Sequence, residues 1–175
     1  MTAPAPEGGR RPRIVAFIDE EGRYDYVALQ AVERAADWDG TLILYDSSTA
    51  SPFTEPIASD MSAEGEGDQF GDPLRADELH RLGRPAIASR VEEARERGID
   101  AWGWLPSEQG VDGFLKYGDE QEADLLILPA ELADGVVRDV EPERVVGPGR
   151  PPGRRVEGAA WIMLIEPAGR REDQE

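Results

Sequence analysis

A short apolar run, an amphipathic helix and a second short apolar run follow one another near the start of the chain. The two runs are Arg13–Asp19 and Thr41–Tyr45, and such short continuous apolar runs are typical of strands buried on both faces of a parallel sheet. Between them, apolar residues recur with helical spacing over Tyr24–Trp38, and we expect Gly40 to end this helix in a left-handed conformation. A strand–helix–strand unit of about 30 residues predicts parallel strands, because these need a crossover connection.

The rest of the chain continues this alternation. A helical pattern covers Asp77–Arg97, in which Pro85 is expected to cause a kink or to begin a second helix, with Gly98 as the C-terminal cap. Further elements are predicted at Ile99–Leu105 (strand), 111–118 (helix), Ala123–Leu128 (strand) and Ala159–Ile165 (strand). Five strands alternating with helices predict a doubly wound α/β fold.

The length of 175 residues suits one domain. We assign residues 13–167 to this domain, with a flexible leader at 1–12 and a charged tail at 168–175. Residues 47–76 are acidic and lack apolar periodicity, which indicates a mobile loop. Within it, residues 60–71 have a glycine at the sixth position of a calcium loop, but glycine also stands at the twelfth, where glutamate is required. We therefore predict no metal site there.

The charge balance excludes some classes of partner. The chain carries 37 acidic and 19 basic residues, a net charge of −18, which repels nucleic-acid phosphates and anionic membranes. No apolar run approaches the roughly 20 residues of a membrane span, and the start lacks the apolar stretch of a signal peptide. We expect a cytoplasmic protein, whose acidic composition reflects either salt adaptation or genome bias.

Few residues of the chain are suited to catalysis. There is no cysteine, and His80 is the single histidine, so thiol chemistry, disulfides, a histidine metal cluster and a Ser-His-Asp triad are excluded within one chain. Neither a phosphate-binding Gly-x4-Gly-Lys-Ser/Thr motif nor a Gly-x-Ser-x-Gly elbow occurs. Trp102 and Trp104 share one face of the third strand and are explained as core or edge cover. We predict no catalytic residues, no metal and no enzymatic activity.

The order of elements resembles one known family. The first strand ends in Ile18–Asp19 before an alanine-rich helix, and Gly113–Leu128 contains a helix that ends just before an Ala-Asp-aliphatic run. Over Arg13–Pro129 and again over Ala159–Pro167 the chain is similar to the universal stress protein family. The resemblance implies a Rossmann-like sandwich, a five-stranded, mostly parallel sheet of order 3-2-1-4-5 between helices. It also implies a homodimer, and it leaves ATP binding open, since some members bind ATP and others do not.

The resemblance also implies the position of a ligand. In ATP-binding members, an aspartate that ends the first strand contacts adenine, and Asp19 matches that position. Ligands of such sheets bind outside the carboxyl ends of the strands, where the first and fourth strands are neighbours. This predicts an adenine-side crevice formed by Ile18, Asp19 and Leu128. The alternative is that Asp19 only caps the following helix.

The phosphate side departs from the family pattern. ATP-binding members have Gly-x2-Gly-x9-Gly-Ser/Thr after the fourth strand, whereas this chain has Pro129, Glu131 and Asp134. Proline has no amide proton, and the two acids repel phosphate. Residues 147–155 contain arginines that could wrap an anion, but we interpret them as a solvated proline-glycine loop. We expect ATP to bind weakly or not at all, and no other cofactor.

The leading interpretation is a non-enzymatic stress-response or signalling module. The alternatives are an adenine-nucleotide-binding protein or nucleotide-dependent enzyme with a rebuilt phosphate loop, and an acidic scaffold that recruits a protein partner. We predict a homodimer through the fifth strand, Ala159–Ile165, because an unbroken apolar run at a sheet edge invites pairing with another chain. In the alternative, the Pro-Gly-rich segment folds over this edge and leaves a monomer.

Overall fold

The computed structural model describes residues 12–47, 73–106, 110–132, 134, 145–146 and 160–167. Within these residues the strands form one sheet of order β3-β2-β1-β4-β6-β5, and every pair of neighbouring strands is parallel. The predicted 3-2-1-4-5 order is confirmed, with β6 as the fifth strand. The structure adds β5, a two-residue strand outside β6.

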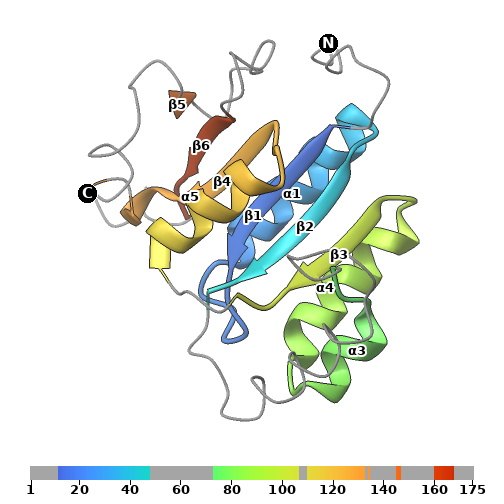
Figure 1. The fold of residues 1–175 in the computed structure, drawn as a ribbon. Coiled ribbons are helices and arrows are strands. Elements are labelled where there is room, and N and C mark those ends of the chain that lie inside the picture. The colour runs from blue at the N-terminus through green and yellow to red at the C-terminus, as the bar shows by residue number, and fades with distance from the viewer. Residues whose placement is uncertain are drawn as a thin grey trace, which may run out of the picture.

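The elements follow the predicted alternation (Figure 1). The strands are β1 Arg13–Ile18, β2 Thr41–Asp46, β3 Asp100–Trp104, β4 Leu125–Pro129, β5 Val145–Val146 and β6 Trp161–Ile165. The helices are α1 Asp25–Trp38, α3 Ala76–Arg81, α4 Pro85–Glu96 and α5 Gly110–Glu120, with a 3-10 turn, η1, at Ala130–Leu132.

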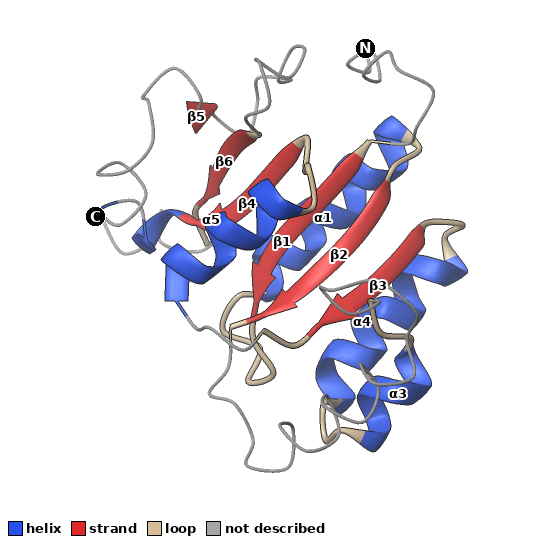
Figure 2. Cartoon of the chain, viewed as in Figure 1, coloured by secondary structure: helices blue, strands red, loops and turns tan. Residues whose placement is uncertain are grey.

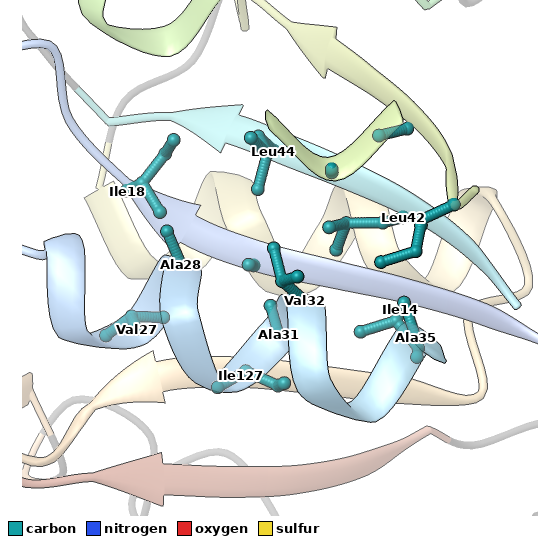
Figure 3. Packing of buried hydrophobic residues seen from close by; sticks show 14 of the residues in the cluster. Ile14, Ile18, Val27, Ala28, Ala31, Val32, Ala35, Leu42, Leu44 and Ile127 are labelled. Carbon is teal, nitrogen blue, oxygen red and sulfur yellow. The ribbon is translucent and has the colours of Figure 1, made fainter. Parts of the chain in front are cut away.

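One face of the sheet is packed with aliphatic and alanine side chains. Helices lie on both faces (Figure 2), and α1 and α4 contribute most of the helical residues to this face. Figure 3 shows strand residues of this aliphatic cluster facing α1. Its labelled members are Ile14, Ile18, Val27, Ala28, Ala31, Val32, Ala35, Leu42, Leu44 and Ile127. Small residues on α1 let the helix approach the strands closely, as dense interior packing requires.

The opposite face is aromatic where α5 covers it. Phe114 of α5 packs edge-on against Phe17 at 5.3 Å and against Tyr45 at 5.1 Å between ring centroids. Tyr117 stacks on Trp104 at 4.8 Å, so Trp104 covers the core as predicted. The buried Tyr117 hydroxyl has no hydrogen-bond partner in the described part of the chain. Burial raises the pKa of Tyr117 above its ordinary value.

The end of α1 differs from the expectation. Asp39, with φ 52° and ψ 46°, takes the left-handed conformation that was predicted for Gly40. A Cβ atom at Gly40 would lie 2.8 Å from the Pro12 carbonyl oxygen, an oxygen that also accepts a hydrogen bond from the Thr41 N–H at 2.8 Å. Glycine is needed at position 40 for this close approach rather than for the left-handed turn.

The segment before β3 forms two helices. Pro85 begins α4 after α3 has ended, and Gly98 has the left-handed φ of 84° expected of a cap. Leu74, inside the predicted loop 47–76, forms an antiparallel bridge with Gly103, so described structure begins before the end of that loop. The leader 1–11, the loop residues 48–72, the arginine-containing stretch 147–155 and the tail 168–175 lie outside the described residues. Among the described helices, none is long and apolar enough to cross a membrane.

Candidate functional site

Two parallel strands place their last residues side by side at one end of the sheet. In the register of β1 and β2, Ile18 lies opposite Asp46, and the N–H of Ser47 donates a hydrogen bond to the Ile18 carbonyl at 2.7 Å. Asp19 follows Ile18 directly. We refer to Asp19, Arg23, Asp46 and Arg84, with Glu20, as the strand-end site.

The carboxylate of Asp19 is occupied by the chain itself. Its side chain is fully buried, and its Oδ1 accepts a hydrogen bond from the backbone N–H of Arg23 at 2.9 Å. The Nε–H of Arg23 donates to Oδ2 at 2.7 Å. This hydrogen bond is the main cause of the raised pKa of Arg23, and the charge of Glu21 adds to it. Asp19 thus closes the turn that precedes α1, whose N-cap residue is Tyr24.

The other two predicted crevice residues point to different faces. Ile18 lies in the aliphatic cluster, and Leu128 lies in the cluster on the opposite face of the sheet, with Phe114 and Tyr117 of α5; both residues are buried. Successive strand side chains alternate between faces, so β1 and β4 do not bring these two side chains together. Of the three residues, only Asp19 presents a polar group at the strand ends.

The start of the predicted phosphate side carries negative charge. β4 ends at Pro129, which has no N–H, and η1 follows at once with Glu131. The pKa of Tyr24 is raised, chiefly by burial and then by the charge of Glu131. Tyr24 packs against Phe17 of β1 at 5.7 Å between ring centroids.

A second buried aspartate, not recognised in the sequence, ends β2. The Oδ2 of Asp46 lies 2.9 Å from the Nε of Arg84, and the two side chains are 2% and 10% exposed. Arg84 is the N-cap residue of α4. The pair therefore attaches the start of α4 to the carboxyl end of β2. The available signal was an acid directly after a buried strand, the same pattern that marked Asp19.

Glu20 caps α4 from another element. Its Oε1 accepts a hydrogen bond from the N–H of Ala86 at 2.7 Å, and its Oε2 accepts one from the N–H of Ile87 at 3.0 Å. These are the free amides of the first helical turn, and no side-chain cap comes from Arg84. The β1–α1 turn and the N-terminus of α4 are thereby held together.

His80 lies away from the strand-end site. It is on α3, about half exposed, with its Nε2 3.2 Å from the Oε1 of Glu92 on α4. Within the described ranges, no three His, Cys, Asp or Glu residues are grouped so as to hold a metal ion. The strand-end site therefore consists of carboxylates that arginines or backbone amides already engage.

The comparisons with known proteins bear on the fold. No protein-family model matches the chain, and the search of curated proteins found no match. Among solved structures, a protein from the universal stress protein family of Burkholderia pseudomallei is 15% identical, with a TM-score of 0.50 over 90% of this chain and 98% of that one. A universal stress protein from Archaeoglobus fulgidus, also 15% identical, has a TM-score of 0.49 over 75% of this chain and 90% of that one.

The parallel sheet with helices on both faces defines a doubly wound α/β protein. The similarity to the Burkholderia protein then shows that the chain has the universal stress protein fold. The resemblance predicted from the order of elements is confirmed at this level.

Proposed function

We propose that this chain is a non-enzymatic stress-response or signalling module of the universal stress protein fold that does not hold ATP tightly. The observation that carries the proposal is the pairing of Asp19 with Arg23, since both carboxylate oxygens accept hydrogen bonds from that one residue. An adenine base that reached Asp19 must first displace the guanidinium. It then has to recover hydrogen bonds to a charged group, each worth about 1.5–3 kcal/mol.

The phosphate side supports the same conclusion. Tight phosphate binding uses backbone amides that converge near a helix N-terminus. In this chain β4 ends at Pro129, and a three-residue turn that contains Glu131 follows. Compared with the glycine-rich loop of ATP-binding members, Pro129 offers no amide and Glu131 adds a negative charge. With a net charge of −18, the whole molecule also repels a polyanionic ligand at long range.

Calorimetric titration of the purified protein tests the proposal. We expect no submicromolar binding of ATP or AMP, no nucleotide that co-purifies, and no rise of the thermal unfolding midpoint with either ligand, since only a bound ligand stabilises the native state. A submicromolar dissociation constant for ATP, or hydrolysis of ATP above that of a heat-inactivated sample, would overturn it.

A further inference from the structure

The turn that follows β1 carries two carboxylates whose contacts run in different directions. Asp19 closes the turn on itself, since its Oδ1 accepts the hydrogen bond from the Arg23 N–H at 2.9 Å. Glu20, the next residue, reaches from the same turn to α4, where it accepts hydrogen bonds from the N–H groups of Ala86 at 2.7 Å and Ile87 at 3.0 Å. The conformation of one short turn therefore determines both the surroundings of Asp19 and the cap of α4.

The cap that Glu20 supplies holds a helix end without a side-chain cap of its own. The N-cap residue Arg84 makes no capping hydrogen bond through its side chain, and Pro85 begins the helix. The N–H groups of a first helical turn have no partner within the helix, and the helix dipole favours a negative charge beside them. Ile87 is fully buried in the aliphatic cluster, so loss of this cap loosens a turn that packs on the core.

Two ion pairs attach α4 to other elements. Arg84 pairs with Asp46 of β2 at 2.9 Å, and Arg90 pairs with Asp25 of α1 at 2.8 Å. None of these four residues lies in the turn that Asp19 closes. We therefore expect α4 as a whole to stay docked when that turn changes, with the effect confined to the first turn of the helix.

We infer that the state of Asp19 is coupled to the first turn of α4 through this turn, with Asp19 as the positioning residue for Glu20. A ligand that takes Oδ1 of Asp19 from the Arg23 N–H opens the turn, moves Glu20 away from α4 and frays the start of that helix. A ligand that displaces only the guanidinium of Arg23 leaves the cap unchanged, because the backbone hydrogen bond to Oδ1 remains.

The coupling goes beyond the proposed function and does not depend on nucleotide binding, because it arises from contacts of the chain with itself. It makes the first turn of α4 the part of the surface that responds to the strand-end site, and Pro85 and Ala86 are exposed there. Such a coupling is reciprocal, so a partner that binds the start of α4 and displaces Glu20 also loosens the turn around Asp19.

Asp19→Ala tests the coupling, because it removes both acceptor oxygens from the turn. Circular dichroism checks that the variant is folded, and NMR measures hydrogen exchange. The amides of Ala86 and Ile87 should exchange faster by about two- to thirtyfold, the range that corresponds to loss of a helix cap. The amide of Val91, further along α4, should keep its exchange rate. D19A/E20A should be no less stable than D19A, because the cap is already lost.

Arg23→Ala is the matched control, because it takes the guanidinium from the same carboxylate and keeps the backbone N–H that closes the turn. Both α4 amides should exchange as in the unmodified chain. The reciprocal measurement is exchange of the Arg23 amide in E20A, which should become faster, and it replaces D19A if that variant does not fold.

Three results would overturn the inference. The first is a folded D19A variant in which the Ala86 and Ile87 amides keep their exchange rates, or in which Val91 accelerates as much as they do. The second is an equal acceleration of these two amides in R23A. The third is an unchanged Arg23 amide in E20A.

Discussion

An aspartate lies at the carboxyl end of each of two neighbouring strands, directly after β1 and as the last residue of β2, with different consequences. Asp19 and Asp46 are both buried, and each is paired with an arginine. Arg23 is four residues from Asp19 and 62% exposed, whereas Arg84 comes from the start of α4 and is 10% exposed. The first pair closes a local turn beside solvent, and the second joins distant elements in the interior. We therefore expect the Asp46–Arg84 pair to contribute more to stability, and the Asp19–Arg23 pair to control whether a ligand can reach the strand ends.

Substitution of Arg84 by methionine should have the largest effect on stability. It removes the guanidinium from a carboxylate that is 2% exposed, and breaking one side of a buried ion pair costs about 3–5 kcal/mol. Chemical denaturation measures the free energy of unfolding. The control is Arg81→Met, since Arg81 is 73% exposed and its contact with Asp77 is 3.9 Å long. Equal losses in the two variants would contradict the assignment of Asp46–Arg84 as the structural pair.

The double variant D46L/R84M sharpens this result. Replacing both members of a buried pair by apolar side chains is often neutral, because no buried charge is left without its partner. We expect it to recover a large part of the stability that R84M loses. A double variant as unstable as R84M alone would show that the loss comes from packing around Arg84.

The two pairs also show what the sequence could predict. Strands buried on both faces are continuous apolar runs and α1 has a clear helical period, so the parallel alternation was predictable from the residues. The strand order was implied by the resemblance to the universal stress protein family. Asp19 was singled out because it matches the position of the adenine-contacting aspartate in the family that the chain resembles. Asp46 also follows a predicted strand, Thr41–Tyr45, but its partner Arg84 lies far along the chain, so the sequence did not show that the two are paired. A contact between distant residues leaves no local pattern.

Other features were unpredictable for related reasons. β5 has two residues and lies in a segment interrupted by prolines, too short to produce a period. Glu20 is one of many acids in the sequence, and its role depends on where the N-terminus of α4 comes to lie. Ile18 and Leu128 were placed together because both end strands, but their positions in the pleat put them on opposite faces.

Glu20→Ala should have an intermediate effect on stability. It removes the acceptors of the Ala86 and Ile87 amides, and loss of a helix cap costs about 0.5–2 kcal/mol. Hydrogen exchange of these two amides should become faster, as measured by NMR, and the free energy of unfolding should fall. Glu20→Gln keeps one acceptor oxygen. Its amide exchange rates and its free energy of unfolding should therefore lie between those of E20A and those of the unmodified chain.

Glu21→Ala is the matched control for Glu20. Glu21 is 66% exposed and contacts Arg23 at 3.2 Å, so its removal should leave the exchange of both α4 amides unchanged. If E21A and E20A accelerate that exchange equally, the capping role of Glu20 is wrong.

Arg23→Ala should have the smallest effect on stability and the most direct effect on the site. Water can reach the place of a side chain that is 62% exposed, and Asp19 keeps the hydrogen bond from the backbone N–H of residue 23. The unfolding midpoint should stay close to that of the unmodified chain, while Oδ2 of Asp19 becomes available. Calorimetry should then show stronger binding of adenosine than in the unmodified chain, with a smaller gain for ATP because Glu131 remains.

Arg90→Ala is the control for this last comparison, since Arg90 pairs with Asp25 at 2.8 Å and does not contact Asp19. It should not change adenosine binding. A loss of stability in R23A as large as that in R84M would mean that the different solvent exposure of Arg23 and Arg84 does not determine how much each ion pair contributes to stability. Unchanged adenosine binding in a stable R23A variant would mean that Asp19 is not an acceptor for adenine, and that its carboxylate serves only to close the turn before α1.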